Sequence, residues 1–325
     1  MRAIVCHEHT GPEGLRLQDL PPPSPGPRQL LLRVHACGVN FADSLITRGE
    51  YQRQPPLPFI PGFEVAGEVI GLGPDVNGFA IGDRVIAVTP HGGFAEQVAV
   101  DVVRCVPMPA SMPWNDGAAF PVVFGTSHVA LCHRARLQAG ETLVVHGAAG
   151  GVGLTAVAIG AQLGATVIAT ANGTDKLEVA RQHGAHFGID TGREDVRARI
   201  KALTAGRGAD VVYDPVGGDL FAASLRSIAF EGRILVIGFA SRTVPQIPAN
   251  HLLVKNVDVI GVNWPAYAEL NPQVMTQSLH DLLQWVQTGA IRPHVSATYP
   301  LEQTVEAIQQ VVTRRSTGKV VVIPD

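Results

Sequence analysis

Apolar and polar residues follow two different patterns along the chain, and the change between them falls near residue 121. Before it, short apolar runs are separated by turn residues, which is typical of β-strands. We expect strands at residues 30–35, 64–71, 83–88 and 94–100. Residues 21–27, Pro-Pro-Pro-Ser-Pro-Gly-Pro, are predicted to form an exposed connection, because proline has no backbone N–H to donate to a helix or a sheet.

From residue 124 onward, apolar strand-like runs alternate with helical stretches. Strands are expected at 142–145, 166–170, 187–190, 210–214 and 234–237, and helices at 151–163, 174–183, 196–203 and 220–229. This alternation is typical of a parallel sheet with helices on both faces. The apolar run 257–262 is expected to add a sixth strand, and helices at 274–288 and 301–313 follow it. The sequence therefore predicts an α/β protein with one strand-rich part and one doubly wound part.

Composition places the chain among compact globular proteins. Its 325 residues suffice for two domains, and 46% of them are hydrophobic while only 16% are charged. A net charge of −3 provides no general basic face, so we expect no nucleic-acid partner. The four cysteines include no Cys-x-x-Cys pair, and the N-terminus lacks the apolar core of a signal peptide. These features favour a cytoplasmic protein without disulfides.

Residues 142–174 contain no Asp, Glu, Lys or Arg, which raises the question of a membrane span. The same segment holds seven glycines together with His146, Gln162 and Asn172. A lipid-facing helix would leave these polar groups unsatisfied, so a buried strand-helix-strand unit is the better interpretation. We expect no contact with a membrane.

A glycine-rich turn is the motif that carries chemistry. The strand at 142–145 runs directly into residues 146–153, His-Gly-Ala-Ala-Gly-Gly-Val-Gly, and then into a helix. Glycine permits a tight turn and close backbone approach, and a helix N-terminus offers free N–H groups to a pyrophosphate. We predict dinucleotide binding here; a tight turn without a ligand is the alternative, and no Gly-Lys-Ser/Thr follows to make an ATP-binding P-loop. The expected contacts are Gly147, Gly150, Gly151, Val152 and Gly153.

The end of the next strand bears on the choice of cofactor. An NAD-preferring site normally carries an acid there for the ribose 2′-hydroxyl, whereas this chain has Thr170-Ala171-Asn172-Gly173-Thr174. The small polar residues Thr170 and Asn172 would admit a 2′-phosphate, and Lys176 could neutralise it. The alternative is an ordinary solvated lysine in the first turn of a helix. The sequence predicts NADPH.

Several motifs in register resemble one known family. They are residues 36–43 (ACGVNFAD), 61–67 (PGFEVAG), 82–85 (GDRV), 147–153 (GAAGGVG), 214–218 (DPVGG) and 316–324 (STGKVVVIP). Their order and spacing resemble those of the zinc-independent quinone oxidoreductases of the zeta-crystallin type, within the medium-chain dehydrogenase/reductases. The resemblance implies a GroES-like β-barrel catalytic domain at residues 1–123 and 265–325. It implies a Rossmann NADPH-binding domain at 124–264.

The resemblance also implies roles for individual residues. Zinc-dependent relatives carry ligands where this chain has Asn40 and Phe63, and an amide and a phenyl ring cannot replace thiolate and imidazole, so no metal is expected. Asn40 is expected beside the nicotinamide ribose and substrate, unless it only satisfies a local turn, and Tyr51 is the nearby phenol. Further cofactor contacts are expected at Thr126, Gly238, Phe239, Ala240, Val262 and Asn263. Arg314 and Lys319 are expected to close on the cofactor phosphates, with solvated charges as the alternative.

These residues favour hydride transfer from NADPH to a quinone or an α,β-unsaturated carbonyl, because a conjugated acceptor delocalises its own developing charge. No Gly-x-Ser-x-Gly elbow and no Tyr-Lys pair of short-chain dehydrogenases occurs in the sequence. Two other hypotheses remain open: an NADPH-dependent reductase of enoyl thioesters, and a non-catalytic NADPH-binding protein with a crystallin-like or RNA-binding role. A homodimer is expected through the strand at 257–262, since an apolar sheet edge invites pairing.

Overall fold

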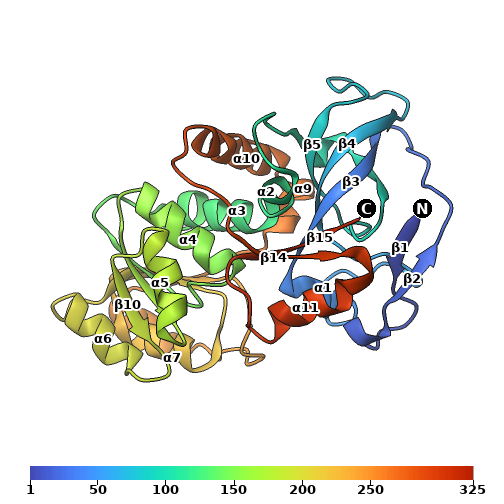
Figure 1. Cartoon of the computed structure of the whole chain (residues 1–325). Coiled ribbons are helices and arrows are strands. Elements are labelled where there is room, and N and C mark those ends of the chain that lie inside the picture. The colour runs from blue at the N-terminus through green and yellow to red at the C-terminus, as the bar shows by residue number, and fades with distance from the viewer. Residues whose placement is uncertain (325) are drawn as a thin grey trace. The chain divides into compact units, whose positions relative to one another are not determined.

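A computed structural model describes residues 1–324, which form two compact units (Figure 1). The first unit contains residues 1–122, 268–287 and 292–324, and the second contains Val123–Tyr267 and Thr288–Ile291. The division therefore falls within a few residues of the expected boundaries. The short segment Thr288–Ile291 belongs to the second unit, although the family resemblance implied that it belongs to the first.

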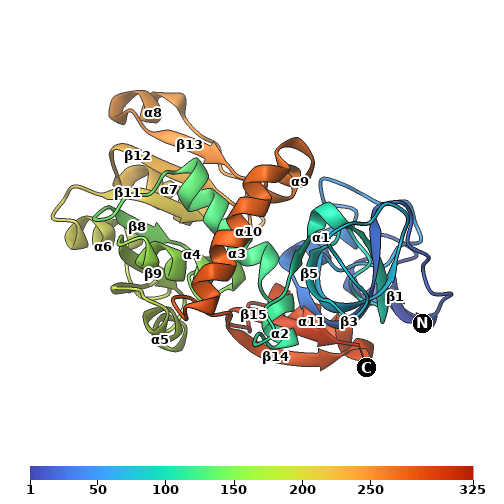
Figure 2. The same ribbon diagram turned by 90° about the horizontal axis from the view of Figure 1, so that it is seen from above.

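The second unit is built on a six-stranded parallel sheet. In chain order its strands are β8 (Thr142–Val145), β9 (Thr166–Ala171), β10 (Phe187–Asp190), β11 (Ala209–Asp214), β12 (Ile228–Val236) and β13 (Asp258–Gly261). Their order in space is β10-β9-β8-β11-β12-β13, the Rossmann order. Figure 2 shows β9, β8, β11, β12 and β13 of this sheet from above. The fold class expected for this part is confirmed. Between β8 and β11 the order reverses, and ligands of such sheets bind at the carboxyl ends of the strands there.

Helices connect these strands. They are α4 (Gly151–Gln162), α5 (Thr174–Gln182), α6 (Val196–Leu203), α7 (Gly218–Ser227) and α8 (Ala249–Lys255), preceded by α3 (Pro121–His128) and a π-helix at Val129–Arg134. Val144, Ile168, Val212 and Ile234 from four neighbouring strands are fully or almost fully buried in one core cluster. The positions of these strands that face this core are apolar, because the sheet buries them beneath the helices.

Two details of the second unit differ from the sequence prediction. The helix expected to reach residue 229 ends at Ser227, because Ile228 already pairs with Ala209 as the first residue of β12. Helix α8 was not expected. Its three large apolar residues, Leu252, Leu253 and Val254, are consecutive, so they show no helical periodicity.

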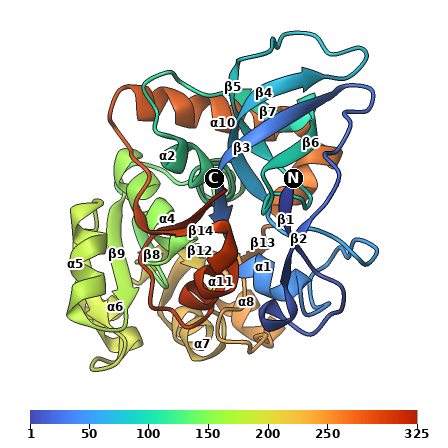
Figure 3. The same ribbon diagram turned by 45° about the vertical axis from the view of Figure 1, so that its right-hand side comes forward.

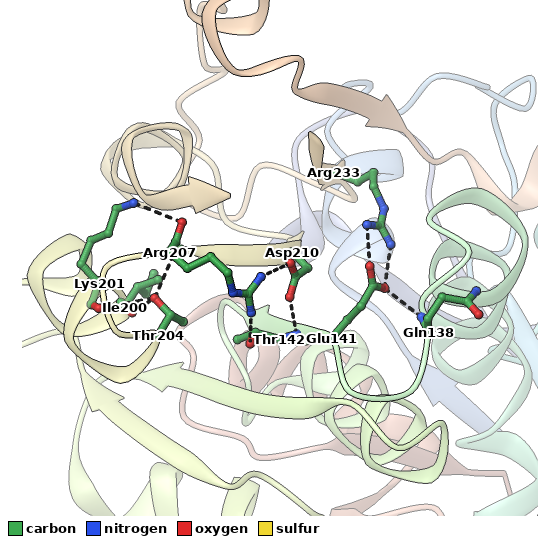
Figure 4. Close-up of polar contacts among 10 residues, drawn as sticks. Gln138, Glu141, Thr142, Ile200, Lys201, Thr204, Arg207, Asp210 and Arg233 are labelled. Carbon is green, nitrogen blue, oxygen red and sulfur yellow. Dashed lines mark hydrogen bonds and ion pairs between the residues drawn. The ribbon is translucent and has the colours of Figure 1, made fainter. Parts of the chain in front are cut away.

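The amino ends of the central strands are held by ion pairs (Figure 4). Nη1 and Nη2 of Arg233 on β12 donate at 2.8 Å to Glu141, which lies just before β8. Asp210 on β11 accepts from the backbone N–H of Thr142 at 2.7 Å and pairs with Arg207. These contacts fix β8, β11 and β12 to one another at the end of the sheet away from the glycine turn.

The first unit contains a seven-stranded, mostly antiparallel sheet. Its strands are β3 (Gln29–Val39), β4 (Glu64–Leu72), β5 (Arg84–Val88), β6 (Gln97–Asp101), β7 (Cys105–Pro107), β14 (Val295–Pro300) and β15 (Lys319–Ile323). β15 pairs antiparallel with β3, with Val320 opposite Val39, so the end of the chain is part of the N-terminal sheet. β1 (Arg2–Val5) and β2 (Arg16–Asp19) form a separate ribbon, visible side by side in Figure 3.

The helices of this unit are α1 (Phe41–Ile46), α2 (Trp114–Ala118), α9 (Tyr267–Leu270), α10 (Pro272–Gln287) and α11 (Thr304–Val312). Tyr267, the first residue of α9, falls in the second unit. The strand expected at 94–100 is shifted to Gln97–Asp101, while Phe94 is a fully buried core residue. Residues 21–27 lie outside any helix or strand, as predicted, and all four cysteines are free. Within residues 1–324, no helix is both long and apolar enough to cross a membrane.

Candidate active site

The glycine turn has the geometry that the sequence predicted. β8 ends at Val145, and α4 begins at Gly151 with Gly150 as its N-cap. Gly147 has φ 57°, a left-handed conformation that favours glycine, and a Cβ on Gly153 would lie 2.2 Å from the Gly147 carbonyl oxygen. Only glycine at position 153 lets the helix start so close to the turn. The first N–H groups of α4 have no side-chain cap and stand at the carboxyl end of the sheet.

A buried histidine supports this turn from beneath. His146 is fully buried; its Nδ1 lies 2.9 Å from Thr170 Oγ1 and its Nε2 lies 2.6 Å from Ser224 Oγ. Ser224 donates its own proton to Leu220 O, so Nε2 of the ring donates and Nδ1 accepts from Thr170. Burial lowers the pKa of His146, which keeps the ring neutral.

The expected role of Thr170 therefore needs correction. Its side chain is fully buried and bonded to His146, and its carbonyl oxygen accepts from Ala148 N at 3.0 Å. A hydroxyl held inside the sheet is not available to a cofactor. Thr170 instead joins the end of β9 to the glycine turn.

The loops after β9 and β10 enclose a pocket of about 340 Å³. Asp190 joins the two loops, because its Oδ1 accepts from the backbone N–H groups of Gly192 and Gly173 at 3.0 and 3.1 Å. Both bonds lower the pKa of this carboxyl group. Arg193 contributes a cation that the sequence analysis did not identify; its side chain is 80% exposed, and its Nε lies 3.7 Å from Asp190 Oδ2. The residues that line the pocket are Asn172, Gly173, Thr174, Asp175, Lys176, Asp190, Gly192 and Arg193.

Other expected cofactor contacts also lie at the carboxyl end of the parallel sheet. Gly238, Phe239 and Ala240 follow β12, where Ala240 N donates to Pro215 O at 3.0 Å. Val262 and Asn263 follow β13, and Thr126 lies on α3. Asp214 shapes the neighbouring loop by accepting from Val216 N and Gly217 N. The residues after β12 and β13 thus lie at the carboxyl end of the sheet, while the cofactor role of Thr126 stays a prediction.

A buried polar cluster occupies the first unit where β15, β3 and β4 meet. Lys319 is 3% exposed, and its Nζ donates to Val39 O at 2.6 Å, Asn40 Oδ1 at 2.8 Å and Glu64 Oε1 at 2.7 Å. A lysine ammonium has three N–H groups, and all three are used. The expectation that Lys319 closes on cofactor phosphates is therefore wrong, since its charge is enclosed and paired with Glu64. Arg314, after α11, is exposed, and its phosphate role stays a prediction.

Asn40 joins this cluster. Its Nδ2 donates to Glu64 Oε1 at 2.8 Å and to Gly38 O at 3.3 Å, and it is the N-cap of α1. Glu64 is fully buried, and its second oxygen accepts from Val122 N at 2.9 Å. A Cβ on Gly38 would lie 2.3 Å from Ala118 O, so the cluster closes tightly around that glycine.

Comparison with known proteins identifies the family. Residues 26–110 match the family described as alcohol dehydrogenase GroES-like domain, and residues 151–285 match that described as zinc-binding dehydrogenase. The rat protein named quinone oxidoreductase-like protein 2 is 41% identical over 320 residues, which cover 98% of this chain and 91% of the rat protein. The chain belongs to the quinone oxidoreductase family.

Solved structures agree. A quinone oxidoreductase of Pseudomonas syringae superposes with a TM-score of 0.93 at 32% identity, covering 99% of both chains. The quinone oxidoreductase of Escherichia coli, solved in complex with NADPH, has a TM-score of 0.93 at 28% identity and covers 100% of both chains. The expected resemblance, fold class and enzyme class are confirmed. The protein is an oxidoreductase of the medium-chain dehydrogenase/reductases.

One of the two matching families is described as zinc-binding, but the side chains of this protein at the positions of the zinc ligands do not fit Zn²⁺. Zn²⁺ takes thiolate, imidazole or carboxylate ligands, whereas Asn40 and Phe63 supply an amide and a phenyl ring. Across residues 1–324, no group of three or more His, Cys, Asp or Glu side chains could hold a metal ion. The Lys319 ammonium, bonded to Asn40 and Glu64, also disfavours a second cation there.

Tyr51, the expected phenol, packs against Phe63 with ring centroids 5.2 Å apart. Burial raises the pKa of Tyr51, so the ring keeps its O–H at neutral pH. Arg53, two residues later, binds Glu269 at the start of the C-terminal part of this unit through both guanidinium nitrogens. This exposed ion pair connects the loop that carries Tyr51 to α9.

Asp43 is a buried carboxyl group with one oxygen unsatisfied. Its Oδ2 accepts from Asn40 N at 2.7 Å, while Oδ1 has no hydrogen-bond partner within residues 1–324. Burial raises the pKa of Asp43 to about 7, against the Asn40 N–H and the Lys319 charge, which lower it. With a pKa of about 7, the Asp43 carboxyl group changes between its protonated and its ionised form near neutral pH.

Replacement of Asp43 should change the pH dependence of stability. At pH values below 3.8, the ordinary pKa of an aspartate, Asp43 is protonated in both the folded and the unfolded protein. Between pH 3.8 and about 7 it ionises only in the unfolded chain, so the free energy of unfolding falls as the pH rises through this range. Asp43→Asn removes this loss. Its free energy of unfolding relative to the wild type should increase by up to about 3 kcal/mol from about pH 5 to about pH 8. Urea unfolding at both pH values measures it, with the exposed Asp19→Asn as control; a difference that falls with pH would contradict the assignment.

Proposed function

We propose that this protein transfers hydride from NADPH to a quinone or an α,β-unsaturated carbonyl. The observation that carries the proposal is the buried cluster around Asn40, in which Lys319 donates all three of its N–H groups to protein oxygens. An isolated carbonyl becomes an alkoxide on hydride transfer and needs a metal, an acid or aimed donors. A conjugated acceptor spreads the same charge, so it requires chiefly orientation and a dry site. The names of the relatives support the same substrate class.

The acceptor preference is testable with purified protein. We expect kcat/KM for a saturated ketone to lie at least about 100-fold below that for the quinone or enone of the same skeleton, because one aimed oxyanion donor is worth about 2.7–4 kcal/mol. Absorbance of reduced nicotinamide measures all three, and an enoyl thioester belongs in the same panel. Equal turnover of the saturated ketone would contradict the proposal, and a thioester as the best substrate would favour the enoyl-thioester hypothesis.

We propose NADPH rather than NADH as the cofactor. Strand β9 ends without a carboxylate, and Lys176 and Arg193 line the pocket beyond it together with Asp175 and Asp190. Asp190 is turned to the backbone N–H groups of Gly173 and Gly192, so its charge is largely satisfied within the loops. A 2′-phosphate would find charged donors here.

Lys176→Ala and Arg193→Ala should each weaken NADPH binding by about 10–150-fold, which corresponds to a charged hydrogen bond of about 1.5–3 kcal/mol, and should leave NADH binding unchanged. Titration of each variant with both cofactors measures this. Arg181→Ala is the matched control, because Arg181 lies on the same helix as Lys176 and pairs with Glu178 outside the pocket. Equal loss of NADPH and NADH would assign the two cations a structural role.

We propose that catalysis needs no metal, because the Asn40 and Phe63 side chains are not zinc ligands. Elemental analysis of pure, active protein should find zinc well below one atom per chain, and treatment with a chelator should leave kcat unchanged. Stoichiometric zinc whose removal abolishes turnover would overturn this.

We propose a homodimer formed through the second unit. β13 is the edge strand of its sheet, and the adjacent α8 exposes Leu253 and Val254 by 78% and 77%. Light scattering at micromolar concentration should give twice the chain mass, and Leu253→Glu with Val254→Glu should halve it. Leu270→Glu, at an apolar residue exposed in the first unit, serves as control. A wild-type monomer would refute the dimer.

A further inference from the structure

We infer that the buried hydroxyl groups of Tyr213, Ser127 and Thr155 hold the first turn of α4 in the position in which its backbone N–H groups receive the pyrophosphate of a dinucleotide. The inference rests on the proposed cofactor and on the expectation that its pyrophosphate binds at the glycine turn. The three residues are positioning residues, because they act through the main chain of α4. All of them lie in the second unit.

The three hydroxyl groups form one network that joins three elements. Tyr213 is on β11, Ser127 on α3 and Thr155 on α4, and all three side chains are buried. Ser127 Oγ lies 2.9 Å from the Tyr213 hydroxyl and 2.8 Å from Thr155 Oγ1. Two main-chain oxygens complete the network: Val152 O lies 2.9 Å from Ser127 Oγ, and Val123 O lies 3.0 Å from Thr155 Oγ1. The network therefore connects the sheet to the helix before the glycine turn and to the helix after it.

The direction of these hydrogen bonds follows from the number of protons. Burial raises the pKa of Tyr213, so the phenol keeps its proton, and Ser127 Oγ is the acceptor beside it. Ser127 therefore accepts from Tyr213 and donates its own proton to Val152 O or to Thr155 Oγ1. In the second case Thr155 donates to the carbonyl oxygens of Val152 and Val123, both 3.0 Å away. In either case Val152 O receives a hydroxyl proton, alone or shared with Val123 O.

A hydrogen bond to Val152 O acts on an N–H group that is available to a ligand. The peptide group is planar, and Val152 O belongs to the same peptide group as the N–H of Gly153. The first intrahelical bond of α4 runs from Leu154 N to Gly150 O at 2.8 Å, so the N–H of Gly153 precedes this bond and is left for a ligand. A hydroxyl on the carbonyl oxygen fixes the plane of the peptide group and polarises its N–H. The network thus orients and strengthens a donor to pyrophosphate without contacting the ligand.

A separate set of contacts holds the glycine turn itself. A Cβ on Gly153 would lie 2.2 Å from Gly147 O, so α4 begins in contact with the turn. His146 bonds to Thr170 and Ser224, which attaches the turn to β9 and α7. The hydroxyl network instead attaches the start of α4 to β11 and α3. One set of hydrogen bonds can therefore be removed by mutation while the other stays in place.

Removal of the hydroxyl groups should weaken ligands that carry a pyrophosphate. Tyr213→Phe and Thr155→Val should each raise the dissociation constants of NADPH and NADH by the same factor of about three to ten, as expected for one neutral hydrogen bond. Both variants should bind adenosine 2′-monophosphate as the wild type does, because this ligand has no 5′-phosphate to reach the turn. Calorimetric titration with the three ligands measures this. Unchanged dinucleotide binding, or an equal loss of adenosine 2′-monophosphate, would overturn the inference.

Two comparisons separate positioning from a general loosening of the unit. Thr155→Ser keeps the hydroxyl group and should stay within about twofold of the wild type, whereas Thr155→Val keeps the shape of the side chain and should not. Ser227→Ala removes another fully buried hydroxyl, which donates to Ala223 O at 2.8 Å within α7, and should change none of the three constants. Equal effects of Thr155→Ser and Thr155→Val would contradict the inference.

A double-mutant cycle tests whether Tyr213 acts through Ser127. Ser127→Ala removes the acceptor of the Tyr213 proton, so adding Tyr213→Phe to it should raise the NADPH dissociation constant no further. Multiplied effects would show that Tyr213 acts independently of Ser127. Lys176→Ala, in the pocket beyond β9, should multiply with Tyr213→Phe, since the two act on different phosphates. A smaller combined effect would assign Tyr213 to that pocket instead.

Thermal unfolding identifies the variants that fold, and if Ser127→Ala does not fold, the comparison of Thr155→Ser with Thr155→Val carries the test. Wild-type protein that binds NADPH but reduces no quinone would refute the proposed function and leave these binding constants readable. Wild-type protein that binds neither dinucleotide would refute the inference together with the cofactor.

Discussion

The ion pair between Lys319 and Glu64 organises the first unit. It forms only if β15 reaches β3 and β4, which ties the last residues of the chain to its first third. Removing one partner of such a buried pair typically costs about 3–5 kcal/mol, because the other charge is left without compensation. A buried pair adds little net stability over an apolar pair of the same shape, and both members of this pair also bond to the Asn40 amide.

The second unit separates its supporting contacts from its ligand-binding end. Ion pairs of Arg233 with Glu141 and of Arg207 with Asp210 secure the amino ends of the central strands. The carboxyl ends instead carry the glycine turn and the loops around Lys176 and Arg193. His146 connects the turn to β9 and α7 through hydrogen bonds to Thr170 and Ser224.

Two cationic side chains, one lysine and one arginine, have different roles in the two units. Lys319 is desolvated and fully bonded, so it has no N–H group left for a ligand. Arg193 is exposed and lines a pocket, so it can meet an anion from solvent. The two aspartates Asp43 and Asp190 also differ in their surroundings. Backbone N–H groups lower the pKa of Asp190, whereas burial raises the pKa of Asp43. What a charged residue does in this protein depends on how many partners surround it.

The sequence by itself determined the elements whose pattern is local. Strands β8 and β10 and helix α6 have the predicted bounds, because apolar periodicity and turn residues act over a few positions. The glycine turn could be predicted for the same reason, since strand, glycines and helix are contiguous. Helix α8 has no buried face and left no such pattern. Tertiary structure decided the rest: Lys319 meets Asn40 across 279 positions, Thr170 turns inward to His146, and Arg193 joins Lys176 only because β9 and β10 are neighbours. Strand pairing brings such residues together, and no local pattern encodes which distant partner a polar side chain will find.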